Sequence, residues 1–138
     1  MHPPSRSPSL NLIVLKQPFF VIQIEVEKLA KELIAQLSFA GKFFSITRTD
    51  EEVSVVGEIH EESLDEFREK ATWTCIKIKG PMTHDLTGIM AAFTAPLKEA
   101  EVPIFAISTW NTDYVLVPTE KLQEACTALE KDGWTFEK

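Results

Sequence analysis

Several residues between positions 82 and 88 have the types and spacing needed to bind a small charged molecule. A helix predicted to start near Leu86 leaves its first backbone N–H groups unpaired, and the partial positive charge there favours a carboxylate. Gly88 has no side chain, so a ligand could lie close to its backbone, and Asp85 could face a ligand ammonium. A purely structural interpretation remains open for both, because Asp is a common helix N-cap and glycine permits close packing.

A second group of polar residues surrounds a predicted turn at residues 110–113. Ser108, Thr109 and Asn111 can supply hydroxyl and amide hydrogen bonds, and Asp113 adds a second acid. Together with the helix start, these groups complement the carboxylate and the ammonium of an amino acid. The alternative is an ordinary turn, because Asn, Thr and Asp are frequent in turns that bind nothing.

Catalytic and metal-binding patterns are missing from the sequence. It contains no Gly-x-Ser-x-Gly elbow, no Gly-x-Gly-x-x-Gly stretch and no Walker loop. His2, His60 and His84 are too scattered to assemble a metal site by spacing. Cys75 is predicted within a strand and Cys126 on the inner face of a helix, positions that suit packing better than nucleophilic attack. We therefore expect no catalytic residue, no metal and no cofactor, and no enzymatic activity.

The elements that must position these groups follow a regular order in the second half of the chain. Alternation of apolar residues predicts strands, and apolar residues three and four apart predict helices. The predicted elements are a strand at Trp73–Lys79, a helix at Leu86–Ala100, strands at Ile104–Thr109 and Tyr114–Val117, a helix capped by Thr119 and stopped by Gly133, and a strand at Trp134–Phe136. This β-α-β-β-α-β order is that of the ferredoxin-like fold.

The first half repeats the order less regularly. Its predicted elements are strands at Leu10–Leu15 and Phe19–Ile24, a helix at Val26–Leu37, a hairpin of Phe43–Arg48 and Val53–Gly57, and a short helix opened by a Ser63–Glu66 capping box. We therefore predict an α+β fold with two tandem βαββαβ units and antiparallel sheets. Residues 1–9 form a disordered tail, residues 10–70 the first unit and residues 71–138 the second, together one compact domain.

The amino-acid composition limits the classes of molecule that the protein is expected to bind. The formal charge of −7 disfavours binding to nucleic acid and to anionic membranes, both of which attract clustered Lys and Arg. Lys16, Gln17 and Pro18 divide the apolar run Leu10–Ile24 into pieces too short to span a bilayer, which needs about 20 residues. Phe43–Arg48 is aromatic but is followed by acids, unlike an RNA-recognition strand. We expect a soluble, cytoplasmic protein.

Three stretches resemble the ACT domain family: His84–Met90, Ala95–Ala100 and Ile104–Val117. More narrowly, they are similar to small two-ACT proteins and to the ACT units of the CASTOR cytosolic arginine sensors and of aspartate kinases. The combination of DLTGI with ISTWNTDYVLV carries the resemblance, and Gly41–Val56 is similar to the first unit of those proteins. This sequence departs from them in having no kinase domain and in being too short for four units.

The resemblance implies two ACT-like units with sheets side by side, and a regulatory role in which an amino acid binds near the first loop and helix of a unit and its second strand. The ligand-binding residues that it implies are Asp85, Leu86, Thr87, Gly88, Ile89, Ile107, Ser108, Thr109, Asn111 and Asp113. The alternative is a dimerisation or adaptor module without a ligand. A homodimer or a regulated protein partner is compatible with both interpretations.

Overall fold

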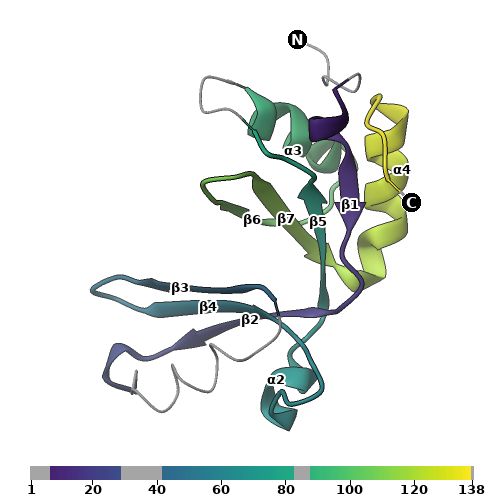
Figure 1. Cartoon of the computed structure of the whole chain (residues 1–138). Coiled ribbons are helices and arrows are strands. Elements are labelled where there is room, and N and C mark those ends of the chain that lie inside the picture. Colours follow the sequence, from purple (N-terminus) through teal and green to yellow (C-terminus); the bar gives the residue numbers. More distant parts are fainter. Residues whose placement is uncertain (1–6, 29–41, 83–87, 138) are drawn as a thin grey trace. The chain divides into compact units, whose positions relative to one another are not determined.

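The computed structural model describes residues 7–28, 42–82 and 88–137, and it divides the chain into two compact units (Figure 1). Unit 1 combines residues 1–16 with residues 74–138, and unit 2 comprises Gln17–Trp73. Unit 2 is therefore inserted between the two segments of unit 1. No helix among the described residues is long and apolar enough to cross a membrane.

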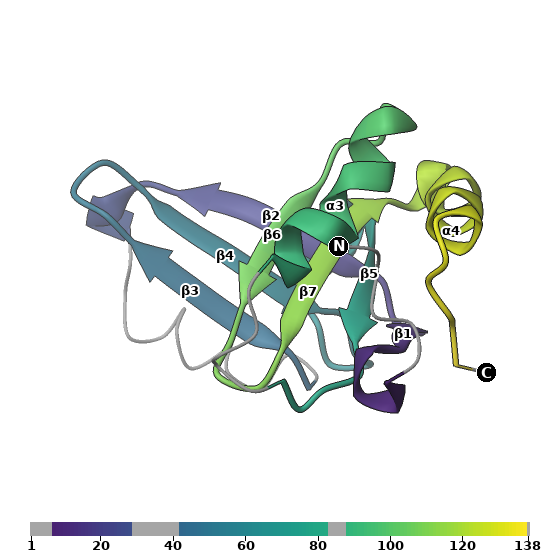
Figure 2. The same cartoon turned by 90° about the horizontal axis from the view of Figure 1, so that it is seen from above.

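Unit 1 is a sheet whose outer strands are each antiparallel to their neighbour, and two helices pack against it (Figure 2). Its strand order is β1 (Leu12–Val14), β5 (Trp73–Ile78), β7 (Asp113–Pro118) and β6 (Phe105–Ser108). The helices are α3 (Ile89–Glu99) and α4 (Leu122–Lys131), with short 3-10 helices η1 (Pro8–Leu10) and η3 (Thr119–Lys121). The first residue of β5, Trp73, is counted in unit 2.

The core of unit 1 lies between this sheet and its helices. Ile76 and Ile78 of β5 alternate along the strand and are completely buried, so they face the helices together. On α3, Phe93 points into the same core, and its ring centroid lies 5.5 Å from that of Trp134. Each side chain of this size contributes about 1.5–3 kcal/mol when fully buried. This core fixes α3 over the strands that carry the polar residues of interest.

Unit 2 has the strand order β3 (Phe44–Arg48), β4 (Val53–Glu58) and β2 (Phe19–Ile24), all antiparallel. It also contains η2 (Val26–Lys28) and the short helix α2 (Asp65–Glu69). Phe20 of β2 stacks on Phe67 of α2 with ring centroids 5.0 Å apart, which closes a small apolar core. Most of the predicted helix Val26–Leu37 lies outside the described residues.

The predicted α+β, ferredoxin-like fold with antiparallel sheets is confirmed, although β1 is placed differently from the sequence order. This strand comes from the first half of the chain but pairs with β5 in unit 1, with Leu12 opposite Ile78. The segment predicted as the last strand, Trp134–Phe136, forms a single parallel bridge between Phe136 and Leu12. Leu12 is completely buried in the core of unit 1, so this placement removes its apolar side chain from water.

Two predicted helix caps do not form. The Ser63 hydroxyl accepts the backbone N–H of His60 at 2.9 Å, and α2 begins after Leu64 without a side-chain cap. The Thr119 hydroxyl pairs instead with the Thr74 hydroxyl at 2.8 Å. In both cases another hydrogen-bonding group lies close enough to compete for the hydroxyl that the cap would use.

Glu58, at the end of β4, holds the start of the preceding hairpin strand, β3, through its carboxylate. Its Oε1 accepts the backbone N–H groups of Lys42 at 2.7 Å and of Phe43 at 3.1 Å, and the residue is 8% exposed. We predict that Glu58→Ala lowers the free energy of unfolding by about 1–3 kcal/mol, because two backbone donors lose their acceptor. Urea unfolding followed by circular dichroism measures this loss.

The matched control is Glu62→Ala, which removes an exposed carboxylate from the same unit. It is expected to change the free energy of unfolding by less than about 0.5 kcal/mol. Equal losses in the two variants would contradict the role assigned to Glu58.

Candidate functional site

The turn between β6 and β7 is closed by three hydrogen bonds between Thr109 and Thr112. The Thr109 backbone N–H donates to the Thr112 carbonyl at 2.9 Å, and the Thr109 hydroxyl donates to the same carbonyl at 3.1 Å. The Thr112 N–H donates back to the Thr109 hydroxyl at 3.4 Å. This closed turn places Ser108 directly opposite Asp113 in the first strand pair.

The same turn contacts the loop that leads from β5 to α3. The Thr112 hydroxyl donates to the Ile78 carbonyl at 2.7 Å, and the Met82 N–H donates to the Asn111 carbonyl at 2.8 Å. Gly80 has a left-handed φ of 69°, and a Cβ built there would lie 3.0 Å from the Cβ of Thr112. A larger residue at position 80 would push the turn away. The two predicted groups of polar residues are thus connected through residues 78–82.

Residues near both chain ends hold the other side of this loop. The Gly80 N–H donates to the Ser9 carbonyl at 2.7 Å, and the Lys79 N–H donates to the Asn11 carbonyl at 2.8 Å. Glu137 adds an ion pair, with its Oε2 3.0 Å from the Lys79 ammonium. Hydrogen bonds from Lys79 and then Asn11 lower the pKa of the Glu137 carboxyl, because they favour its ionised form.

Asp113 is the most unusual polar residue in this region. It is 8% exposed, and its side chain is on the same face of β7 as Val115, which packs in the core beneath the helices. Within residues 7–28, 42–82 and 88–137, no hydrogen bond or ion pair involves its carboxylate. Ser108, its cross-strand neighbour, is exposed on that same face. The carboxylate oxygens are not among the buried side-chain atoms that lack a hydrogen-bond partner, so they reach solvent and are open to a ligand cation.

Helix α3 begins at Ile89, three residues later than predicted. Gly88 occupies the N-cap position with a left-handed φ of 75°, so the right-handed helix cannot include it. Gly88 is exposed, and a Cβ built on it would meet no atom within 4 Å. The first helical turn carries no acid, so the positive end of the helix dipole is not neutralised from within the helix.

The structure does not place all the other predicted site residues where their side chains could contact a ligand. Asp85, Leu86 and Thr87 lie outside the described residues. The Ile89 side chain is 4% exposed and belongs to the core, so only its backbone faces outward.

Strand alternation separates two further predicted residues. Ile107 is opposite Tyr114 and therefore on the other face of the sheet from Ser108 and Asp113. Asn111 is exposed, and its backbone carbonyl is occupied by Met82.

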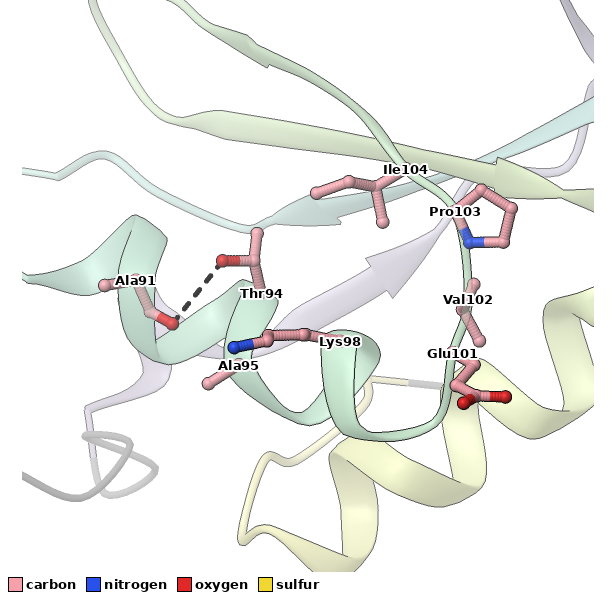
Figure 3. A pocket seen from close by; sticks show the side chains of 8 residues that line it. All are labelled: Ala91, Thr94, Ala95, Lys98, Glu101, Val102, Pro103 and Ile104. Atoms are coloured by element: carbon pink, nitrogen blue, oxygen red, sulfur yellow. Dashed lines mark hydrogen bonds between the residues drawn. The ribbon is translucent and has the colours of Figure 1, made fainter.

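A groove on the described surface lies elsewhere in unit 1. It has a volume of about 710 Å³ and runs between the outer side of α3 and the segment before β6 (Figure 3). Its lining residues are Ala91, Thr94, Ala95, Lys98, Glu101, Val102, Pro103 and Ile104. None of the predicted ligand-binding residues is among them.

The described residues offer little evidence for a metal-binding site or for a reactive cysteine. No three His, Cys, Asp or Glu side chains there are grouped so that they could hold a metal ion. Cys75 is completely buried. Burial and then the charge of Glu130 raise the pKa of the Cys126 thiol, which favours the less reactive protonated form.

Thr112 is the residue that sequence analysis missed, because a Thr between Asn and Asp resembles any turn residue. We predict that Thr112→Val lowers the free energy of unfolding by about 1–3 kcal/mol, since the Ile78 carbonyl loses its donor while the side-chain volume is kept. Thermal or urea unfolding provides the measurement. Thr112→Ser keeps the hydroxyl and should retain more of the stability than Val; the reverse order would contradict this role.

Comparison with solved structures supports the fold of the whole chain. A structure from Agrobacterium tumefaciens is 28% identical, with a TM-score of 0.77, and the match covers 95% of this chain and 94% of that one. The ligand-free regulatory subunit of aspartate kinase from Thermus thermophilus is 12% identical, with a TM-score of 0.59, and the match covers 90% and 95% of the two chains. At 12% identity, this second likeness establishes the fold alone.

Curated relatives and a family model agree with this fold. The bovine (Bos taurus) cytosolic arginine sensor for mTORC1 subunit 1 is 28% identical over 103 residues, covering 66% of this chain and 31% of the sensor. The human (Homo sapiens) counterpart is 33% identical over 60 residues, covering 43% of this chain and 18% of the sensor. This chain thus spans about a third of the length of the bovine relative. The ACT domain model matches residues 68–131, which confirms the resemblance found in the sequence over this segment.

Proposed function

We propose that this protein is a non-catalytic regulatory domain that senses an amino acid in unit 1. The observation that carries the proposal is Asp113, an acid only 8% exposed as a residue, which lies opposite Ser108 and whose carboxylate has no hydrogen-bond or ion-pair partner among the described residues. The proposed ligand-binding residues remain Asp85, Leu86, Thr87, Gly88, Ile89, Ile107, Ser108, Thr109, Asn111 and Asp113.

These residues divide between the two charged ends of an amino acid. The ammonium group is placed near Asp113, where it forms an ion pair with the carboxylate. The Ser108 hydroxyl supplies a further acceptor for its N–H groups. The ligand carboxylate is placed at the start of α3, where Gly88 leaves the backbone open and the helix dipole is favourable. Ile89 then contributes its backbone, and Ile107 acts by supporting the strand from its other face.

The comparisons support this proposal at the level of protein class. One relative is named as a cytosolic arginine sensor, and one solved structure is a regulatory subunit of aspartate kinase. We therefore place this protein in the cytoplasm, and we rank arginine, lysine, threonine and the branched-chain amino acids first among ligands. A regulated protein partner belongs to the same proposal, and nucleic acid and membranes do not.

A thermal-shift panel of amino acids tests the proposal. A ligand at about 100 times its dissociation constant should stabilise the protein by about 2.7 kcal/mol, which raises the melting temperature measurably. We predict that Asp113→Asn abolishes the shift, because the ammonium loses its charged partner. The matched control is Asp132→Asn, an exposed acid of the same unit, which should leave the shift intact.

The absence of a shift with every amino acid at millimolar concentration would reject amino-acid sensing. An unchanged shift in Asp113→Asn would retain sensing but move the ligand to another site.

A second candidate function, a dimerisation or adaptor module without a ligand, is favoured by the edge of unit 1. Strand β6 is at the end of the sheet order, and Ile104 just before it is 37% exposed. The groove beside α3 adjoins the same edge. Unpaired strand edges next to apolar surface are common sites of association between chains, so a homodimer through this edge is the corresponding proposal.

We predict that Ile104→Lys converts such a dimer to monomer, because a charge would have to be buried in the interface. Light scattering after size exclusion measures the mass. Leu64→Lys, at a site of similar 40% exposure in unit 2, is the control and should remain dimeric. A wild-type protein that is monomeric at tens of micromolar would exclude this second function.

A further inference from the structure

Unit 2 repeats the hairpin turn of the proposed site with the same hydrogen bonds. The Thr49 N–H donates to the Glu52 carbonyl at 2.9 Å, the Thr49 hydroxyl donates to that carbonyl at 3.4 Å, and the Glu52 N–H donates back to the Thr49 hydroxyl at 3.1 Å. These are the three bonds made by Thr109 and Thr112 in unit 1. The two turns can therefore be compared residue by residue.

The strand pair next to the turn differs between the units. Arg48 is opposite Val53 in unit 2, at the place where Ser108 is opposite Asp113 in unit 1. Val53 is completely buried and packs in the same core as Val55, so its side chain faces inward as that of Asp113 does. Unit 2 therefore has a methyl-bearing core residue where unit 1 has a carboxylate, and it has a cation where an ammonium would have to approach.

The loop on the other side of the turn also differs. Two residues after the end of β5, Gly80 leaves room for Thr112; two residues after the end of β2, Val26 packs against the core of unit 2. Thr112 is 3% exposed and bonded to the Ile78 carbonyl. Its counterpart Glu52 instead accepts a long, exposed hydrogen bond of 3.4 Å from Gln23. The polar contacts around the turn of unit 1 are thus replaced in unit 2 by apolar packing below an acidic turn.

From these differences we infer that each chain binds a single amino acid, in unit 1, and that unit 2 is a closed copy of the site that does not bind it. The inference rests on the proposed sensing function and adds its stoichiometry and location. In unit 2, Val26 is partly buried at the position that corresponds to Gly80. Val53 is completely buried at the position that corresponds to Asp113. A zwitterion entering unit 2 would have to displace these apolar contacts beside Arg48, whose positive charge repels an ammonium.

Isothermal titration calorimetry of the full chain tests this inference with L-arginine, L-lysine, L-threonine and L-leucine titrated separately. The expected result is one site per chain for the amino acid that binds. Asp113→Val, which copies the residue of unit 2 into unit 1, should reduce the affinity more than 100-fold. Asp113→Asn provides a second variant should Val disturb folding, which circular dichroism would reveal. The control Arg48→Ser, which copies Ser108 into unit 2, should still bind one molecule per chain.

The possible failures are distinguishable. Two sites per chain, or one site that survives Asp113→Val and Asp113→Asn, would overturn the inference while leaving amino-acid sensing intact. No heat with any of the four amino acids, together with no thermal shift across the wider panel, would overturn both the inference and the proposed function. Backbone amide NMR shifts provide an independent readout, since they should cluster in residues 74–138 and leave those of β3 and β4 unchanged.

Discussion

The hydrogen bond from the Thr112 hydroxyl to the Ile78 carbonyl determines how the hairpin of unit 1 meets the end of β5. It is buried, so breaking it would leave a polar group without water as a substitute. The bond orients the turn so that the Asn111 carbonyl reaches Met82, and Gly80 makes the close approach possible. This contact also sets the position of Asp113 relative to the start of α3. Asp113 begins β7 directly after the turn, and α3 follows the loop after β5.

Local sequence pattern was sufficient for the elements of this fold, and it failed where distant groups compete. The apolar residues Ile89, Phe93 and Leu97 recur every four positions, and they form the inner stripe of α3 as expected. The Thr119 hydroxyl, by contrast, has the right spacing for a cap but binds Thr74, which is remote in sequence. The location of β1 in unit 1 depends in the same way on a non-local partner, the edge of β5.

The candidate site shows the same division between local and tertiary information. Residue type alone selected Ser108 and Asp113, and strand register brings them together. The alternation of the strand already implied that Ile107 faces the other side, although the resemblance to the family had grouped it with them. The burial of Thr112 depends on a segment thirty residues away, so no local pattern distinguishes it from an ordinary turn residue.

Residues 9–11, 79–80 and 137 meet at one point of unit 1, through the Ser9 and Asn11 carbonyls and the Glu137 carboxylate. A fluorescent protein or a dye attached next to residue 9 or next to residue 137 would be linked to residues 79–80 by only a few bonds. A change in these residues would therefore alter the orientation of the attached label directly. A label at either place therefore reports directly on the geometry of residues 79–80.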